Sequence, residues 1–228
     1  LQHMLANRGI MERSEFLATT QLFRESSPQE IEAMLGCLAA HERRYKAGAR
    51  IHRMGDIITT TGVVLEGSVR IESVDRWGNV SVLGVKKSGE MFGEAYAAVP
   101  NEPLMVDVVA AEDTAVLFLN LTKMLTTCTH ACPHHARISA SVTAIIARQS
   151  LDLSRRILHV APKTIRGKVL AYLSDVAERT GENEFDIPFD RQQLADYLGV
   201  DRSALSAELS RMQKAGLIET RRSHFVLK

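Results

Sequence analysis

The 228-residue sequence has few cysteines, few aromatic residues and no long hydrophobic segment. Its three cysteines, Cys37, Cys128 and Cys132, are too few and too unevenly spaced for a disulfide scaffold, which favours a reducing compartment. No apolar run approaches the ~20 residues that span a bilayer, and the N-terminus lacks a basic stretch followed by an apolar one. We therefore expect a cytoplasmic protein with no membrane partner.

Charge is nearly balanced over the whole chain, at a formal net charge of +1, but it is unevenly distributed. Residues 162–201 contain five Lys and Arg against eight Asp and Glu, a net charge of −3. Residues 202–228 contain six basic residues against two acidic ones, a net charge of +4. A basic segment of this kind is typical of a protein that binds a polyanion.

The N-terminal half of the chain changes from a helical to a strand-like pattern. Residues 14–42 are helical in pattern, with a helix start at Ser27 and Pro28, and we expect Cys37 to pack in the core beneath this helix. From residue 45 to residue 121, short β-branched runs alternate with glycines, and "DRWGN" is a hairpin turn signal between two of them. Several short strands at near-regular spacing predict a small antiparallel barrel or roll.

After Pro133 the pattern returns to a helix that continues to Val160. Its apolar residues recur at spacings of three and four, which is typical of a coiled-coil dimer helix, although a helix packed only on its own barrel would show the same spacing. The break at "HVAPKT" predicts a hinge, so we divide the chain into a sensing domain (14–132), a long helix (133–160) and a C-terminal domain (161–228). The predicted dimerisation residues are Ile138, Val142, Ile145, Ile146, Gln149, Leu153 and Ile157.

The C-terminal domain contains two capped helices joined by a glycine turn. Asp190 with Gln193 predicts a capping box at the start of the first helix, Gly199 permits a left-handed turn at its end, and Asp201 caps the second helix. The following "GLIETRRSHFVLK" predicts two short strands. Together these elements predict a winged helix-turn-helix, a module that binds double-stranded DNA.

The exposed face of the second helix is small and uncharged at its centre. Side chains that approach base edges must be small or form hydrogen bonds, whereas cations belong where phosphates pass. We expect Arg202 and Ser203 to be the main base readers, followed by Ser206. The predicted DNA-binding residues are Arg191, Gln192, Arg202, Ser203, Ser206, Ala207, Arg211, Lys214, Arg221 and Arg222.

The roll, the long helix and the segment "RQQLADYLGVDRSALSAELSRMQKAGLI" together resemble the Crp/Fnr family of bacterial transcription regulators over nearly the whole chain. "GEMFGEAY" resembles the Gly-Glu turn of that family's cyclic-nucleotide-binding roll. The resemblance implies an α+β fold: an N-terminal antiparallel β-roll, a long dimerisation helix and a C-terminal winged helix-turn-helix. It also implies a homodimer on a palindromic promoter site, RNA polymerase as a further partner, and a small-molecule or redox effector in the roll.

Two positions depart from the family pattern. In the cyclic-AMP-binding members an Arg-Ser pair about ten residues after the Gly-Glu holds the cyclic phosphate, but Leu104 and Met105 stand there in this chain. A buried phosphate needs a charged, hydrogen-bonded partner, so we expect an effector that is less charged than cyclic AMP, or none. The candidate effector residues are Met91, Phe92, Gly93, Glu94, Tyr96 and Met105.

The second departure is Ala207, where many members have an arginine that reads a guanine. Alanine can contact a thymine methyl group but cannot form the bidentate guanine contact. We therefore expect the discrimination of about 1–3 kcal/mol at that base pair to be absent or to come from another residue. We therefore expect a different operator sequence.

The segment "CTHACPHH", just before the long helix, is the weakest of the candidate sites. Cys128 and Cys132, with the neighbouring histidines 130, 134 and 135, suggest a metal, haem or redox sensor as an alternative function. Buried cysteines and solvated histidines are the simpler interpretation, since no second ligand pair is evident elsewhere, and the cofactor is left unassigned.

Two functions of other classes are alternatives to a DNA-binding regulator. A cupin-type enzyme would need a His-x-His and glutamate set on adjacent strands, but the barrel region offers only His52, so we expect no catalytic residues and no enzyme. A sensor that has lost DNA binding would explain Ala207. The retained cations at 211, 214, 221 and 222 argue against it.

Overall fold

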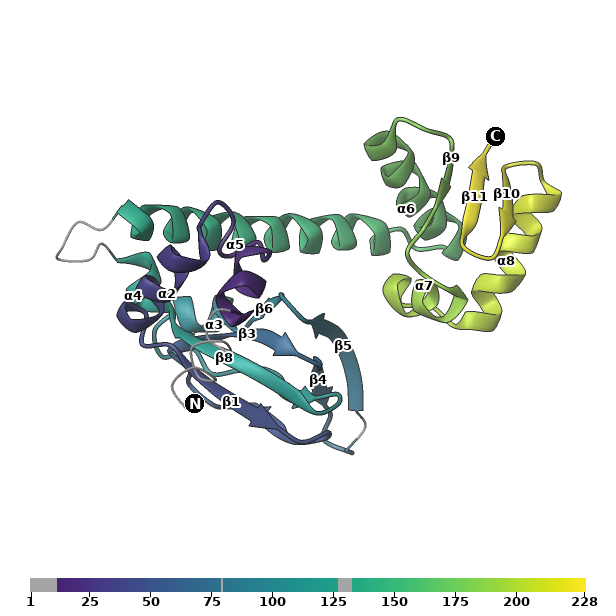
Figure 1. Ribbon diagram of the computed structural model, residues 1–228. Helices are drawn as coiled ribbons and strands as arrows, with labels where there is room; N and C mark the ends of the chain where they lie inside the picture. The colour runs from purple at the N-terminus through teal and green to yellow at the C-terminus, as the bar shows by residue number, and fades with distance from the viewer. Residues whose placement is uncertain (1–11, 79, 127–132) are drawn as a thin grey trace. The chain divides into compact units, whose positions relative to one another are not determined.

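The computed structural model describes residues 12–78, 80–126 and 133–228, and the chain divides into two compact units at Ala147/Arg148. The N-terminal unit contains two antiparallel four-stranded sheets, with strand orders β1-β8-β3-β6 and β2-β7-β4-β5 (Figure 1). Their strands are β1 (His41–Tyr45), β2 (Arg50–His52), β3 (Thr60–Glu66), β4 (Ser68–Val74), β5 (Val80–Lys87), β6 (Met91–Phe92), β7 (Asp107–Ala110) and β8 (Thr114–Asn120). This is the predicted antiparallel roll.

The space between the two sheets is filled by side chains from both. Val64 and Val116 of the first sheet pack there with Val69 and Val108 of the second, and the ring of Phe92 lies against Gly62. A Cβ at Gly62 would come within 2.2 Å of that ring, so the close approach requires glycine. The first strand starts earlier than the sequence pattern predicted: His41 pairs with Phe118 in the β1–β8 ladder instead of continuing a helix.

Short helices cover the roll. They are a helical segment at 12–18, α2 (Pro28–Cys37), α3 (Glu94–Ala98) and α4 (Leu121–Leu125). The predicted start of α2 is confirmed: the Ser27 hydroxyl accepts from Glu30 N and the Glu30 carboxylate accepts from Ser27 N. The prediction for Cys37 is wrong, because this last residue of α2 is exposed.

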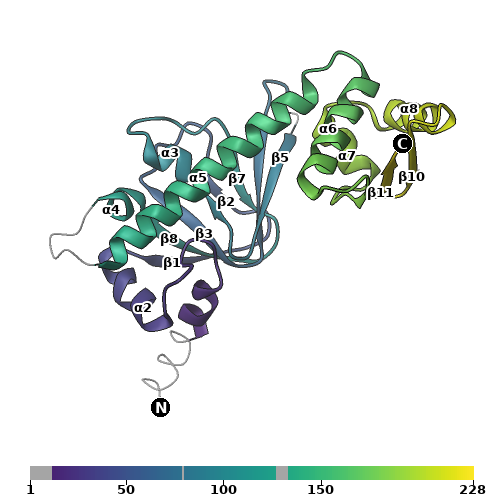
Figure 2. The ribbon, with the colours of Figure 1, turned by 90° about the horizontal axis from the view of Figure 1, so that it is seen from above.

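The long helix α5 (Pro133–Val160) is a single continuous helix that begins next to α4 (Figures 1 and 2). Ile138 and Val142 are at most 2% exposed and belong to the same core cluster as Leu17 and Met124, so the prediction that they form a dimer seam is wrong. Ile145 and Ile146 pack partly against that cluster. The apolar stripe seen in the sequence is, over its first half, the face that covers the helix's own roll.

The C-terminal unit is a winged helix-turn-helix. Its elements are α6 (Ile165–Thr180), β9 (Glu184–Asp186), α7 (Arg191–Leu198), α8 (Arg202–Lys214), β10 (Ile218–Arg221) and β11 (His224–Leu227). The two predicted wing strands pair, and β9, which the sequence pattern did not predict, pairs with β11 as a third strand. The core contains Leu194 and Leu198 of α7 and Leu205, Leu209 and Met212 of α8.

The part of the chain that the structure describes contains no helix long and apolar enough to cross a membrane.

Candidate nucleic-acid interface

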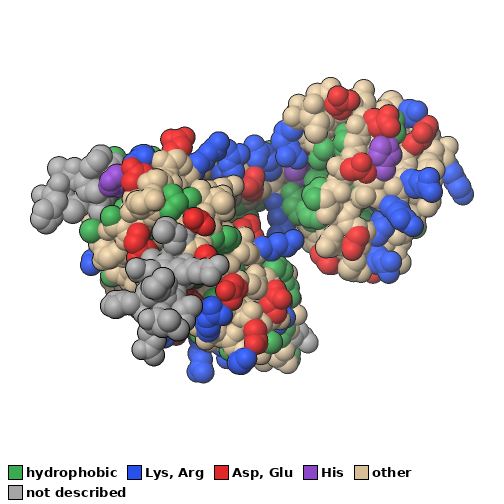
Figure 3. All heavy atoms as spheres, in the orientation of Figure 1, with side chains coloured by type: hydrophobic (Ala, Val, Ile, Leu, Met, Phe, Trp, Pro, Cys, Tyr) green, Lys and Arg blue, Asp and Glu red, His purple; other side chains and the backbone are tan. Residues whose placement is uncertain are grey.

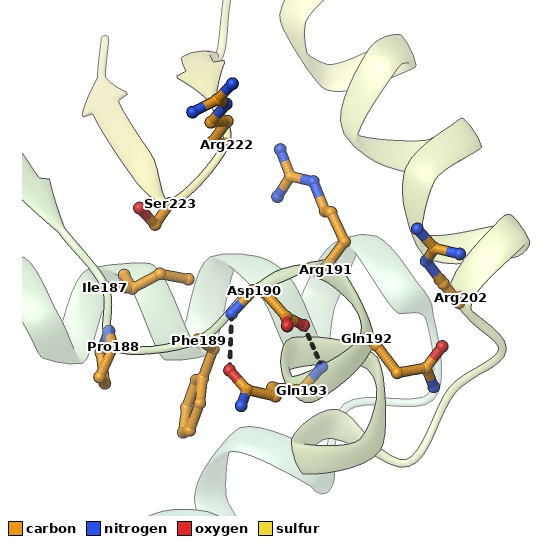
Figure 4. A pocket seen from close by; sticks show the side chains of 10 residues that line it. All are labelled: Ile187, Pro188, Phe189, Asp190, Arg191, Gln192, Gln193, Arg202, Arg222 and Ser223. Carbon is orange, nitrogen blue, oxygen red and sulfur yellow. Dashed lines mark hydrogen bonds between the residues drawn. The ribbon is translucent and has the colours of Figure 1, made fainter.

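The start of α7 is fixed by the predicted capping box (Figure 4). Asp190 Oδ1 accepts from Gln193 N at 2.8 Å, and Gln193 Oε1 accepts from Asp190 N at 2.9 Å. At the other end, Gly199 adopts φ 61°, in the left-handed region that glycine occupies without strain. The tight turn that follows positions α8 against α7.

The start of α8 is held by Asp201. Its carboxylate accepts from the hydroxyl of Ser203 and from Ala204 N at 2.8 Å, and these hydrogen bonds hold the pKa of Asp201 below its usual value. Asp201 therefore stays ionised at the positive end of the helix dipole, where a carboxylate is most stabilising.

The outward face of α8 carries four small residues, Ser203, Ser206, Ala207 and Ser210, and all four are exposed. The Ser203 hydroxyl donates to Asp201, and the Ser210 hydroxyl donates to the Ser206 carbonyl oxygen at 3.0 Å. Both serines can still accept hydrogen bonds. Ser206 has no hydrogen bond from its hydroxyl within the described residues, so it is the serine best able to donate to a base edge.

Four cations around this face are exposed and have no acidic partner within the described residues. They are Arg202 at the start of α8, Lys214 at its end, and Arg221 and Arg222 in the wing. Figure 3 shows Lys and Arg side chains distributed over the surface of the C-terminal unit. Unpaired cations on both sides of an uncharged helix face are the arrangement expected for a helix that lies in a groove of a duplex, where the cations contact the phosphates of the two strands.

A pocket of about 620 Å³ lies where the starts of α7 and α8 meet the wing (Figure 4). Arg191, Arg202 and Arg222 line it from these three elements, whereas the Asp190 carboxylate is turned toward its own helix cap. The pocket can accept an anion such as a phosphate group, because guanidinium groups recognise phosphate through several N–H donors at once.

Besides Ser203, three of the predicted DNA-binding residues have partners inside the domain. Arg191 Nη2 donates to Thr220 Oγ1 at 2.9 Å, its guanidinium lies 5.3 Å from the Phe225 ring centroid, and burial lowers its pKa. Gln192 Nε2 donates to Asp196 Oδ1 at 2.8 Å. Arg211 is paired with Glu208, at 2.6 Å between Nη2 and Oε2. These side chains are less free to follow DNA than the sequence predicted.

One part of this surface is not predictable from the sequence. Glu208 of α8 is only 7% exposed and is bonded both to Arg211 and to Arg166 of α6, whose Nε lies 2.7 Å from Glu208 Oε1. The only signal for Glu208 was a charged residue next to the buried positions 205, 209 and 212 of α8. Nothing in the sequence indicated which arginine it meets.

Arg222 is strained in the turn between β10 and β11, with φ 56° in the left-handed region. That conformation costs a non-glycine residue about 1 kcal/mol. We expect Arg222→Gly to leave the Tm unchanged or raise it, and at the same time to weaken DNA binding by one phosphate contact. The slope of log K against log salt should fall by about one, as measured by fluorescence anisotropy. Unchanged affinity at every salt concentration would show that Arg222 contacts no DNA.

A buried histidine connects the end of α5 to the helix-turn-helix. His159 is 3% exposed; its Nδ1 lies 2.9 Å from Tyr197 Oη on α7, and its Nε2 lies 3.5 Å from Asp175 Oδ2 on α6. Arg156, one turn earlier, lies over the Tyr197 ring and donates to the Tyr197 carbonyl oxygen. The last turn of α5 is thereby fixed to α6 and α7 of the C-terminal unit.

Burial lowers the pKa of His159, a change that Asp175 opposes and Arg179 and Arg155 reinforce. The unfolded chain takes up a proton near the usual pKa of about 6.5, whereas the folded chain resists it, so stability is full above that pH and falls below it. We expect the Tm to drop between about pH 7.5 and about pH 5.5, and His159→Gln to reduce that drop. His224→Gln, at a half-exposed position, is the control, and an equal drop in all three proteins would contradict this assignment.

The candidate effector residues do not share one environment. Met91 and the half-buried Tyr96 pack in the cluster beneath α2 and α5, Phe92 lies between the two sheets, and Met105 is 67% exposed. Gly93 adopts φ 77° at the start of α3. Glu94 is 4% exposed, and its Oε2 has no hydrogen-bond partner within the described residues.

Cys128, Cys132 and His130, the main candidates for a metal or redox site, lie outside the described residues. His134 is described, and its Nδ1 lies 3.2 Å from Glu30 Oε1. Within the described ranges no group of three or more His, Cys, Asp or Glu side chains could hold a metal ion.

Comparisons with known domains agree with both halves of the fold. Residues 42–130 match the cyclic nucleotide-binding domain, and residues 167–228 match the Crp-like helix-turn-helix domain. The chain is 24% identical over 196 residues to the transcriptional activator protein FnrA of Stutzerimonas stutzeri, covering 84% of this chain and 78% of that protein. It is 25% identical over 180 residues to the nitrogen fixation regulation protein FixK of Rhizobium meliloti (strain 1021), covering 78% and 77%.

Solved structures show the same fold. The global regulator CLP of Xanthomonas campestris, described as c-di-GMP responsive, matches with a TM-score of 0.56 at 24% identity, over 86% of this chain and 97% of that one. A mutant of CooA from Carboxydothermus hydrogenoformans matches with a TM-score of 0.58 at 18% identity, over 90% and 88%. A roll followed by a Crp-like helix-turn-helix defines a DNA-binding transcription regulator. The chain belongs to the Crp/Fnr family of these regulators.

Proposed function

We propose that this regulator acts in the cytoplasm as a homodimer that binds a palindromic DNA site, under the control of an effector held by the N-terminal roll. One observation carries the DNA-binding part of the proposal. The side chains on the outward face of α8 are small and uncharged, and four cations without acidic partners in the described chain surround this face. Phosphate contacts at Arg202, Lys214, Arg221 and Arg222 supply affinity, while Arg202 and Ser206 also reach bases. RNA polymerase is the expected partner at the promoter.

A second copy of the chain is proposed to pack against α5 on the face opposite to its buried residues. Six exposed residues recur there at alternating spacings of four and three, which is the heptad spacing of a coiled coil. The small ones let two helix backbones approach closely, and Leu151 and Leu158, at 57% and 68% exposed, provide the apolar contacts. The residues are Ala140, Ala144, Ala147, Leu151, Ser154 and Leu158.

The effector is proposed to be something other than cyclic AMP. Leu104 is 2% exposed within the apolar core and Met105 points into solvent, so neither position offers a donor to a cyclic phosphate. We expect titration calorimetry to detect no cyclic-AMP binding in the micromolar range. Micromolar binding would refute this part of the proposal and would require a phosphate site made from other residues.

Salt-dependent binding to a pool of random-sequence duplexes tests whether the chain binds DNA. A protein that neutralises several phosphates loses affinity linearly on a log–log plot as salt rises, with a slope of about −0.9 for each phosphate. We expect a slope of about −3 or steeper from the four free cations of one subunit. Absence of binding in dilute salt would contradict the proposal and favour a sensor that has lost the ability to bind DNA.

A further inference from the structure

The buried carboxylate of Glu208 on α8 lies between two arginines, Arg166 of α6 and Arg211 of α8. Glu208 Oε1 accepts from Arg166 Nε at 2.7 Å, and Glu208 Oε2 accepts from Arg211 Nε at 2.8 Å. Arg211 Nη2 forms an ion pair with the same carboxylate, 2.6 Å from Oε2. The hydrogen bond from Arg166 is the main reason why the pKa of Glu208 lies below its usual value. The carboxylate is therefore ionised at neutral pH, and the three side chains together carry one net positive charge instead of two.

The triad of Glu208, Arg166 and Arg211 lies beside the outward face of α8. Arg211 follows Ala207 by four residues, so it lies one turn further along the same side of α8. Glu208 comes directly after Ala207 and turns toward α6, where Arg166 meets it. Both guanidinium groups are therefore held at one flank of a helix face that carries no charge of its own at its centre.

Each arginine still has donors to offer. Arg166 uses only Nε in the triad, and its side chain is 45% exposed; neither of its Nη nitrogens has a partner within the described residues. Arg211, at 64% exposed, uses Nε and Nη2 and keeps Nη1. A free arginine on a long flexible stem can follow any nearby phosphate, whereas one that is held by a carboxylate presents its remaining donors at fixed positions.

We infer that Glu208 is a specificity-determining positioning residue: by fixing Arg166 and Arg211 at the flank of α8 and cancelling one of their charges, it makes the helix discriminate between DNA sequences. The inference rests on the proposed DNA binding. Without Glu208, one more unpaired cation strengthens binding to any duplex, because the electrostatic contribution is independent of sequence. The freed arginines at the same time no longer favour the sequences whose backbone and bases meet their fixed donors.

The test uses the full chain and two probes: a pool of random-sequence duplexes and the duplex that the wild-type protein enriches from that pool. For Glu208→Gln we expect tighter binding to the random pool, a salt slope steeper by about one, and a preference for the enriched duplex lowered by about tenfold. The matched control is Glu178→Gln, which changes the net charge equally at an exposed position about 18 Å along α6 from Arg166. It should leave both the slope and the preference close to wild type.

A double variant separates charge from position. Glu208→Gln with Arg211→Gln restores the wild-type net charge, so affinity for the random pool should return to about the wild-type value while the preference stays low. Recovery of the preference in this variant, or an unchanged preference in Glu208→Gln, would overturn the inference, because a purely structural ion pair would change only the melting temperature. Circular dichroism confirms that each variant is folded.

Should Glu208→Gln fail to fold, Arg166→Gln serves in its place, since it removes one of the two guanidinium groups and leaves Glu208 bonded to Arg211. We expect a lower preference in this variant, and a wild-type preference would overturn the inference. A wild-type chain that binds random duplexes but enriches no sequence also overturns it while leaving DNA binding intact. A wild-type chain that binds no duplex contradicts the proposed function itself.

Discussion

Replacing Leu151 by glutamate should convert the proposed homodimer into a monomer and lower affinity for a duplex with two inverted half-sites by about 100-fold or more. Leu151 lies at the middle of the exposed heptad face of α5, and a symmetric contact would bring two glutamates together in place of two leucines. A monomer engages only one half-site, so the gain from linked binding of the second half-site disappears. Sedimentation equilibrium and anisotropy measured on the same samples check both effects.

Leu153→Glu is the matched control for this experiment. Leu153 is 62% exposed, close to the 57% of Leu151, but two residues further along a helix it lies about 200° around the axis, on the other side of α5. This variant should remain dimeric and bind as the wild type does. A monomeric Leu153→Glu together with a dimeric Leu151→Glu would instead place the partner on the stripe that includes Leu153 and Ile157.

Arg202→Ala should reduce the preference for the enriched sequence by about 10- to 100-fold, corresponding to the 1–3 kcal/mol of a bidentate base contact. Arg202 is exposed at the first turn of α8 and has no acidic partner in the described chain, and Ala207 offers no guanidinium further along. Loss of Arg202 therefore removes the arginine best placed to read a guanine. Competition between the enriched duplex and single-base-pair variants of it measures the effect and identifies the base pair concerned.

Lys214→Ala provides the comparison, because Lys214 lies at the far end of α8, where backbone contact is expected. It should weaken binding to all duplexes by a similar factor and lower the salt slope by about one. If Arg202→Ala also lowers affinity for all duplexes by the same factor, Arg202 contacts a phosphate in the pocket beside Arg191 and Arg222 and not a base.

Much of the fold follows from local signals in the sequence. The capping boxes at Ser27 and Asp190 and the left-handed Gly199 were predictable because each depends on residues within a few positions of one another. The alternation of β-branched runs and glycines likewise predicted the antiparallel roll. The three-residue strand β9 was too short to give such a pattern.

Two of the errors concern contacts between distant residues. Periodicity identified an apolar stripe on α5 but not which surface covers it, so Ile138 and Val142 were assigned to a partner although they pack on the roll. The pairing of Arg166 with Glu208 joins residues 42 positions apart, and no local pattern indicates it. Arg211 was consequently predicted as a free phosphate contact, whereas it is bonded to Glu208.

Selection from a fully random duplex pool, followed by sequencing, tests the central claim most directly. The account predicts that the wild-type chain enriches two inverted half-sites with centres about 10 base pairs apart, since a symmetric dimer offers two α8 helices to successive major grooves on one side of the duplex. The half-site should also differ at one base pair from that of family members with arginine at the Ala207 position. Enrichment of a single, unrepeated motif, or of none, would contradict the account.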